Sequence, residues 1–580
     1  GPFLDKIRYV YTALDVSDPN MGQVQALVDG DIDVMSAQIH IGEQFDLIVE
    51  APNVEMSEFY WSGSYYTMLN CFKWPFNVSG FRKALHLALD KNAINDVQGT
   101  YSADSPISAP HPLSVESEME HHYYEPEVAA GAALLESLGF HDIDDDNIRE
   151  GPLGEEIPPI EVKFLQGEGA GPILADTANI IVEALQNLNF TAFSTRIYHN
   201  GYSHIYSGNY DIFVWTIVEH GIGLEKVINY WVNWCEQLGW QNSTFESLAE
   251  VALTSTDYNE VEDAVKQLQY MIIEGAPWIV VIQIPLFSAY RTDTFDIVEH
   301  ATGGPHSFYT GLRGFNSSSN STGDTLRWGS NDNVMYLSPR TSPSPYGLQW
   351  WAYYEDHMEM MHDSLARVGM DLSATNWLAK DFLVETHDDD SAITENHTRI
   401  TVNIIDNATW SDGHSITAND VAFSINWFRD NFKTVDEFFD ENDFILDDLF
   451  YCYSKTDTKV IFEFATESWW HWFDVCFIPI IPAHAHDQYN PDRYDPMRGV
   501  FVTPEEFNDL VTSGPFMPSE WVEGEYIEIK QNPYYWKNPR LIPPEPSVVP
   551  PPDFTLAIIG GVISAAAVII VGGAIVVKKK

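Results

Sequence analysis

Positively charged side chains are scarce in this sequence. Lysine and arginine together number 30, against 85 aspartates and glutamates, which gives a formal net charge of -55 at pH 7. Nucleic-acid-binding proteins neutralise phosphates with clustered lysine and arginine, so the composition excludes that class. We interpret the acidic excess as a solvated, self-repelling surface of the kind expected in salty water.

Motifs for catalysis and metal binding are also missing. Ser513 has neither a Gly-x-Ser-x-Gly elbow nor a histidine paired with it in the sequence. His121, His122 and the "HAH" at 484–486 lack a third ligand nearby. The "DIDDDNIRE" at 142–150 lacks the glycine and the distal glutamate of an EF-hand loop. The sequence therefore predicts a protein without catalytic residues, metal or cofactor, and not an enzyme.

What is present is the composition of a large folded protein. Apolar residues make up 45% and aromatic residues 13% of the chain, which is too rich for a disordered acidic protein. A length of 580 residues is several times the ~100–200 residues of one domain, so two or more lobes are expected. Strand-like and helix-like segments are intermixed, which predicts an α/β class with mixed sheets, that is, mixed α+β.

One long uncharged run stands near the C-terminus. It extends from Phe554 to Val577 and is followed by three lysines at 578–580. About 20 apolar residues cross the hydrocarbon core of a bilayer, so this run is predicted to be a transmembrane helix. The positive-inside tendency makes the lysines a cytoplasmic tail, and the proline-rich residues 541–553 an outer stalk. We therefore expect a single-pass protein of the cell membrane with an extracellular N-terminal body.

Asparagine sequons and cysteines fit an extracellular body. Four cysteines without zinc-site spacing allow two disulfides in three pairings. We expect Cys452 to bond to Cys476, since a strand pair between them can bring their Cα atoms within the ~4.4–6.8 Å that a disulfide needs. Cys71 and Cys235 are left over, and buried free thiols are the alternative. Candidate glycosylation asparagines are Asn77, Asn189, Asn242, Asn316, Asn320, Asn396 and Asn407.

A low-complexity stretch divides the chain into two blocks. The stretch is "GFNSSSNSTGD" at 314–324, and its serine, asparagine and glycine content is typical of a linker. The first block is 1–313 and the second is 325–540.

Local patterns predict elements in both blocks. The alternating "IRYVY" at 7–11 predicts a strand, 81–94 an amphipathic helix and 278–287 a buried strand. In the second block, 400–430 predicts a strand, an Asp-Gly turn and a helix. Thr417, with an aspartate three residues later, supplies the capping box of that helix.

Five stretches resemble a known family. They are "LVDGDIDVM" at 27–35, "FRKALHLALDKNAI" at 81–94, "AALLESLGF" at 132–140, "TWSDGHSITANDVAFSINWFRD" at 409–430 and "TSGPFMPSEWVEGEYIEIKQNPYYW" at 512–536. Together they resemble the successive signatures of the family 5 extracellular solute-binding proteins, the dipeptide and oligopeptide binders of ABC importers. The resemblance covers nearly all of residues 1–540.

The order of these signatures is rotated. Residues 325–540 resemble the first half of the family and residues 1–313 its second half. The "NPYYW" at 532–536 would normally continue into something like the "FLDKIRYVY" at 3–11. The chain is either a circular permutant or a piece of a longer tandem protein. The missing initial methionine and signal peptide favour a fragment or a processed chain.

The two halves can complement each other in either account. The predicted strand at 7–11 should then pair with residues from 325–340 or 512–530. The resemblance implies a two-lobed fold of the periplasmic-binding-protein type, whose hinged closure buries a ligand. One lobe is expected at 59–285, and a small subdomain of the other at 346–499. The rest of that other lobe is expected from 1–58, 286–345 and 500–540.

The stretch "YDIFVWTIVEHGIG" at 210–223 resembles the family segment that recognises the α-amino group of a peptide. Trp215 matches the tryptophan of that segment. The Thr-Gly-Asp that would follow is replaced, and the nearest carboxylate is Glu219, next to His220. Further candidates for stacking on a ligand, with core packing as the alternative, are Tyr346, Trp350 and Trp351, and Trp469, Trp470 and Trp472.

The resemblance implies a receptor that captures peptides and delivers them to the permease of an ABC importer. An oligosaccharide receptor of the same family, and a surface sensor that does not take part in transport, are the alternatives.

Overall fold

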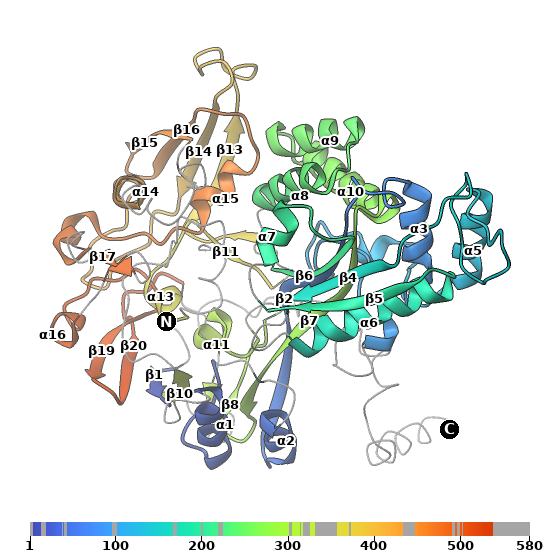
Figure 1. Cartoon of the computed structure of the whole chain (residues 1–580). Coiled ribbons are helices and arrows are strands. Elements are labelled where there is room, and N and C mark those ends of the chain that lie inside the picture. Colours follow the sequence, from blue (N-terminus) through green and yellow to red (C-terminus); the bar gives the residue numbers. More distant parts are fainter. Residues whose placement is uncertain are drawn as a thin grey trace, which may run out of the picture.

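The computed structural model describes most of the chain up to residue 537 (Figure 1). The described residues are 4–12, 19–36, 39, 43–94, 101–165, 171–198, 201–218, 224–300, 304–313, 315–316, 325–330, 356–370, 373–432, 446, 448–489, 494–495, 499–500 and 503–537. The predicted transmembrane run, stalk and tail lie outside them. Among the described residues, no helix combines the length and the hydropathy needed to cross a bilayer.

Strands from both ends of the chain share one sheet. Its order is β10 (Thr325–Ser330), β1 (Lys6–Tyr11), β20 (Tyr526–Gln531) and β19 (Phe516–Val522). β1 runs parallel to β10 and antiparallel to β20. The pairing predicted for the strand at 7–11 is therefore confirmed, and the two blocks are not separately packed bodies.

The second sheet has six strands and is covered by helices on both faces (Figure 1). Its order is β3 (Tyr101–Ser102), β7 (Trp278–Arg291), β2 (Val54–Leu69), β6 (Ile212–Val218), β4 (Ile160–Leu165) and β5 (Ala192–Ile197). The helices around it are α3 (Ser79–Ala88), α5 (Val128–Ser137), α6 (Gly171–Asn187), α8 (Glu225–Leu238), α9 (Ser243–Thr254) and α10 (Tyr258–Gly275).

Side-chain alternation along the strands builds a core on each face of this sheet, because successive residues of a strand point to opposite faces. Ile212 and Val214 pack in the core formed with α3, α5 and α6, whereas Phe213 packs in the core formed with α8, α9 and α10. In β7, Ile279 and Val280 divide in the same way between the two cores.

The long strands β2 and β7 connect this sheet to the rest of the molecule. They pair antiparallel from Val54–Arg291 to Met68–Trp278, with a register shift between Tyr60 and Ser64. At the far end, Val34 bridges Tyr290 of β7 and Trp328 of β10. The β2–β7 ribbon therefore joins the six-stranded sheet to the four-stranded sheet (Figure 1).

A smaller sheet forms a third unit in the second block. Its order is β13 (Ala379–Glu385), β14 (Thr398–Ile404), β16 (Lys459–Phe464) and β15 (Leu449–Thr456), and α14 (Ala418–Phe432) packs against it. The Asp420 carboxylate accepts hydrogen bonds from Thr417 N (2.8 Å) and Thr417 Oγ1 (2.9 Å). The predicted start of this helix is therefore confirmed.

The remaining named elements are short or peripheral. They are α1 (Pro19–Asp29), α2 (Glu43–Glu50), η1 (Glu116–Glu118), α7 (Gly201–Tyr206), β8 (Phe295–Asp296), α11 (Phe308–Arg313), β9 (Phe315–Asn316), α13 (Asp356–Met361), β11 (Ala366–Val368), β12 (Ala374–Asn376), α15 (His471–Cys476), η3 (Ala483–Tyr489), β17 (Tyr494–Asp495), β18 (Gly499–Val500) and α16 (Pro504–Phe507).

Two local predictions require correction. The helix predicted at 81–94 is interrupted, because α3 ends at Ala88 and Leu89 is extended. All four cysteines are free and buried, so the predicted bond between Cys452 and Cys476 is absent. Both residues pack in the apolar core of the small sheet, where a free thiol behaves as a small hydrophobic side chain.

Candidate functional site

Three parallel strands of the six-stranded sheet end at a common edge. β4 pairs in parallel with both β5 and β6, so their carboxyl ends lie together. Such edges are where α/β folds present ligand-binding groups. Trp215 lies on β6 opposite Tyr66 of β2. A Cβ atom at Gly201, the first residue of α7, would collide with the Trp215 indole, so the indole packs directly on that backbone. Glycine at position 201 therefore allows the Trp215 indole to pack against the start of α7 at this edge.

Of the predicted ligand-binding residues, Trp215 is the one whose surroundings can be given. Glu219, His220, Tyr346, Trp350 and Trp351 lie outside the described residues. Trp215 is partly buried and packs against the core that β6 shares with α8, α9 and α10.

The tryptophans at 469–472 are mainly packing residues. Trp472 is 2% exposed and stacks on Phe382 with ring centroids 4.0 Å apart, inside the small subdomain. Trp470 is 1% exposed and belongs to the same core as Phe213 of β6. These two side chains are therefore unavailable for stacking on a ligand, and core packing is the alternative that holds for both.

Trp469 and Trp470 instead join the two blocks. Trp470 Nε1 donates a hydrogen bond to Ala252 O of α9 (2.7 Å), and Trp469 N donates to Ser255 O (2.9 Å). Trp469 also packs against the core that Trp215 contacts. The edge that carries Trp215 and the α15 end of the other block therefore share one apolar cluster. Sequence patterns did not show this contact, because its residues lie far apart in the chain.

Ionisable groups accompany this inter-block contact. Glu225, the first residue of α8, has its pKa raised to about 7 by burial and by the nearby Asp474 carboxylate. Burial disfavours a charged His471, but its 3.1 Å contact with Asp474 outweighs burial and raises the histidine pKa. Two carboxyl groups and an imidazole therefore meet where the blocks touch.

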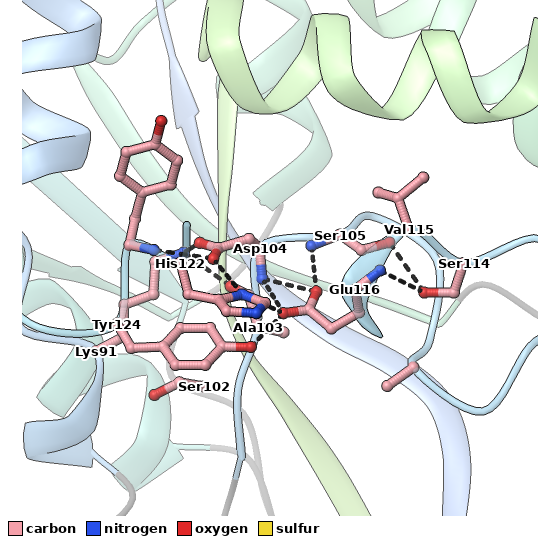
Figure 2. A network of polar contacts seen from close by, with 12 residues as sticks. Lys91, Ser102, Ala103, Asp104, Ser105, Ser114, Val115, Glu116, His122 and Tyr124 are labelled. Atoms are coloured by element: carbon pink, nitrogen blue, oxygen red, sulfur yellow. Dashed lines mark hydrogen bonds and ion pairs between the residues drawn. The ribbon is translucent and has the colours of Figure 1, made fainter. Parts of the chain in front are cut away.

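A buried polar network holds the segment that follows β3 (Figure 2). Lys91 Nζ donates to Asp104 Oδ1 at 2.6 Å, and both side chains are 0% exposed. The Glu116 carboxylate accepts hydrogen bonds from the backbone N–H groups of Asp104 and Ser105 and from the Tyr124 hydroxyl. In Figure 2 the Glu116 carboxylate lies between these donors.

The charged groups of the network shift one another's pKa values. Hydrogen bonds to Asp104 and Glu116 raise the pKa of His122 to about 9. Burial, together with the Lys91 charge, lowers the pKa of His86 to about 4. Burial alone would raise the pKa of Asp104, but Lys91 and the two histidines outweigh it and lower that pKa.

The network has a structural role close to the binding edge. It anchors the 101–124 segment, and within that segment Pro106 O accepts a hydrogen bond from the Tyr66 hydroxyl (3.2 Å). Tyr66 is the strand neighbour of Trp215. We therefore interpret this cluster as a support for the sheet and not as a reaction centre.

Two residues considered for chemistry have structural contacts. Ser513 is 0% exposed, and its Oγ accepts a hydrogen bond from Asp363 N (2.8 Å). In the 142–150 loop, the Asp142 carboxylate accepts bonds from the backbone N–H groups of Asp146 and Asn147, as in a closed turn.

Among the described residues, three groups bring potential metal-ligand atoms within 4.8 Å of one another. One is the acidic loop at 142–146, and a second is the buried network, where Lys91 already supplies a cation to Asp104. The third is Asp412, His414 and His484. Only His484 of this third group was considered from the sequence, because its partners lie about 70 residues away.

Five of the seven sequon asparagines are compatible with a surface position, and Asn320 and the Asn316 side chain lie outside the described residues. Asn77, Asn189, Asn396 and Asn407 are exposed, and the Asn242 side chain caps the start of α9. Their glycosylation stays a prediction.

No curated protein matches the chain. Similar solved structures include a mannohexaose-bound periplasmic oligopeptide-binding protein from Thermotoga maritima (15% identity, TM-score 0.39, 50% of this chain and 57% of that one). AppA from Bacillus subtilis in complex with a nonapeptide gives 14% identity, a TM-score of 0.38 and coverage of 51% and 58%. NikA from Brucella suis in complex with Fe(III)-EDTA gives 18% identity, a TM-score of 0.40 and coverage of 49% of this chain and 58% of that one. The chain thus spans less than two thirds of each of these relatives.

The sequence profile of the bacterial extracellular solute-binding proteins, family 5 (middle region), matches residues 1–233 and 373–547. These two stretches include strands of both main sheets, the β2 strand of the connecting ribbon, Trp215 and the α15 contact. Because the match extends over more than half of the sequence, the chain belongs to the family 5 bacterial extracellular solute-binding proteins.

Proposed function

We propose that this chain is a membrane-anchored extracellular receptor that captures peptides for an ABC importer and performs no catalysis of its own. The observation that carries the proposal is the shared apolar cluster of Trp215, at the carboxyl edge of the parallel strands, and Trp469 and Trp470 of the other block. A solute held at that edge would be enclosed when the lobe that carries Trp215 closes on the part of the molecule that carries Trp469 and Trp470, as binding between hinged lobes requires.

The connection between the sheets supports a hinged mechanism. The β2–β7 ribbon joins them, and its register shifts between Tyr60 and Ser64, where β2 begins to pair with β6 as well. A local irregularity in a two-stranded connection can absorb a change in backbone angles while both sheets stay rigid. Solute capture then requires positioned polar groups and closure, without a nucleophile or a proton-transfer pair.

For the ligand, we propose that Glu219 pairs with the free α-amino group of a peptide and that Trp215 forms an apolar wall beside it. Glu219 follows β6 directly in the sequence. Loops that follow the strands of an α/β sheet are the usual carriers of binding groups. A carboxylate there gives a charge-assisted hydrogen bond to an ammonium group.

Anchoring is proposed from the sequence. The uncharged run at 554–577 and the three lysines after it would hold the body at the extracellular face of the cell membrane, next to a permease.

Calorimetry with matched peptides tests the ligand assignment. The unaltered chain should bind peptides with a free N-terminus more tightly than their N-acetylated forms. Glu219→Gln should weaken binding of the free peptides by about 1.5–3 kcal/mol, the scale of a charge-assisted hydrogen bond, without affecting the acetylated ones. Trp215→Ala should weaken both.

Glu236→Gln is the matched control, because Glu236 is an exposed carboxylate on α8 of the same lobe. It should leave binding unchanged. Equal affinity for free and acetylated peptides would contradict the peptide assignment, as would tight binding of an oligosaccharide in their place.

A further inference from the structure

We propose that Asp412, His414 and His484 form a surface site for one divalent transition-metal ion of the Zn²⁺ type. Asp412 Oδ2 lies 3.0 Å from His414 Nδ1 and 2.8 Å from His484 Nε2. The two imidazole rings lie side by side, with centroids 4.6 Å apart and planes tilted by 39°. One carboxylate oxygen and two imidazole nitrogens therefore converge on one point.

The loop that carries Asp412 and His414 is closed by backbone hydrogen bonds. Trp410 N donates to His414 O (2.8 Å), and Gly413 N donates to Trp410 O (2.9 Å). His414 N also donates to Asp412 Oδ1 (3.1 Å), which fixes the carboxylate and leaves Oδ2 directed at the histidines. Gly413 has a φ of +88°, a conformation that glycine adopts without strain. The two ligands are therefore held on one side of a tight turn.

His484 is fixed from a separate part of the chain. Ala483 N, directly before it, donates to Asp420 Oδ1 (3.1 Å). The Asp420 carboxylate also caps α14 through Thr417, so the backbone at 483 is tied to the start of that helix. The His484 ring contacts the fully buried Trp410 edge to face, with centroids 6.0 Å apart. The third ligand is thus held by a separate segment of the chain that packs on the loop of the other two.

The donor set suits a borderline metal ion. Imidazole nitrogen with carboxylate oxygen is a common ligand combination for zinc and its neighbours. Ligand atoms around a tetrahedral zinc lie about 3.3 Å apart, given bonds of about 2.0–2.1 Å. The observed 2.8 and 3.0 Å therefore require only a small opening of the cluster. His414 is 68% exposed, so water can reach the remaining coordination positions.

Binding would replace the hydrogen bonds of the metal-free cluster. The metal bonds to a ring-nitrogen lone pair, so a neutral imidazole that donates to Asp412 Oδ2 through that nitrogen changes tautomer and carries its proton on the other ring nitrogen. The ion would fasten the 409–415 loop to the 483–486 segment. This site belongs to the small subdomain and is independent of the proposed solute site, so either assignment can fail without the other.

Titration of the metal-free chain with ZnCl₂ against a chromophoric chelator tests the proposal. The unaltered chain should show one saturable site of this kind. His414→Ala and His484→Ala should each weaken that site by about tenfold or more, because each removes a direct ligand. Excess ZnCl₂ should raise the unfolding temperature of the unaltered chain and not that of His414→Ala, since a ligand stabilises the state that binds it.

His486→Ala is the matched control. His486 lies two residues after His484, is exposed, and contacts Ala483 O and Asp487 instead of the cluster. It should bind zinc like the unaltered chain. Unchanged zinc affinity in His414→Ala would overturn the proposal, and so would an equal loss in His486→Ala or the absence of saturable binding. Because the His414 side chain is exposed, its replacement should leave the fold intact. The far-UV circular dichroism spectrum of the variant checks this separately from zinc binding.

Discussion

Lys6 and Glu528 form a 2.7 Å ion pair although 522 residues separate them in the sequence. Glu528 is 1% exposed and also pairs with Arg8 (2.6 Å) from the same strand. β1 and β20 are neighbours in one sheet, so this carboxylate connects the first and last described strands of the chain. The rotated order of the family signatures therefore produces one body built from both blocks.

Glu528→Gln should destabilise the chain by about 2–3 kcal/mol, because the charge-assisted hydrogen bonds from Lys6 and Arg8 to this buried side chain are weakened. Burial alone would raise the Glu528 pKa, but Lys6 and Arg8 outweigh it and lower the pKa. The stabilisation is then fully present above the ordinary value of 4.5 and is lost as the pH falls through the lowered pKa. Chemical denaturation at several pH values measures the difference.

Glu520→Gln is the control for this prediction, since Glu520 is an exposed carboxylate of the neighbouring strand β19. It should have a small effect at all pH values. A Glu528→Gln variant as stable as the unaltered chain at pH 7 would contradict the role of the pair.

Lys91→Met should destabilise the chain by about 3–5 kcal/mol, because it removes the fully buried cation of Asp104 and leaves that carboxylate only the partly exposed His122, 3.3 Å away, as a cation. The double variant Lys91→Met with Asp104→Asn should be destabilised by much less than the sum of the two single variants, because it removes both members of the buried ion pair. A double-mutant cycle by urea denaturation provides the measurement. Strict additivity would show that Lys91 and Asp104 do not act as a pair.

Glu225→Gln should stabilise the chain more at pH 8 than at pH 5. The folded pKa of Glu225 is about 7 against an ordinary 4.5, so the folded chain holds this proton more tightly than the unfolded chain. Its favourable contribution is complete below pH 4.5 and is lost as the pH rises through about 7. The surrounding charged groups are Asp474, His471, Lys226 and Asp448.

Thermal unfolding of both chains across this pH range measures the effect. The gain in unfolding temperature caused by Glu225→Gln should grow with pH. A constant gain, or one that is larger at pH 5, would show that Glu225 is not forced to ionise in the contact between the blocks.

Sequence patterns predicted those parts of the fold that depend on local order. The alternation at 7–11 marked a strand, and the family signatures indicated its partners, β10 and β20. The capping box at Thr417 predicted the start of α14, because its two residues lie within one turn of a helix. The resemblance also led to the prediction that Trp215 ends a strand, which is wrong, because β6 (Ile212–Val218) continues for three residues beyond Trp215.

Features that depend on long-range packing were not predicted. Cys452 and Cys476 were expected to bond, but both are absorbed into one apolar core. Trp470 was considered for a ligand surface, yet its indole is buried against α9. His484 lacked a visible third ligand, because Asp412 and His414 reach it only through the fold. In each case the deciding neighbour is distant in sequence.

Native mass spectrometry of the full chain, purified in mild detergent, tests the central claim most directly. A solute-binding protein of this kind should carry a co-purified ligand in a 1:1 complex, and fragmentation of the released ligand should give peptide sequences with free N-termini. Washing the ligand away and adding a defined peptide should restore the complex, and Trp215→Ala should reduce it. A chain that carries no solute and takes up no added peptide would contradict the account.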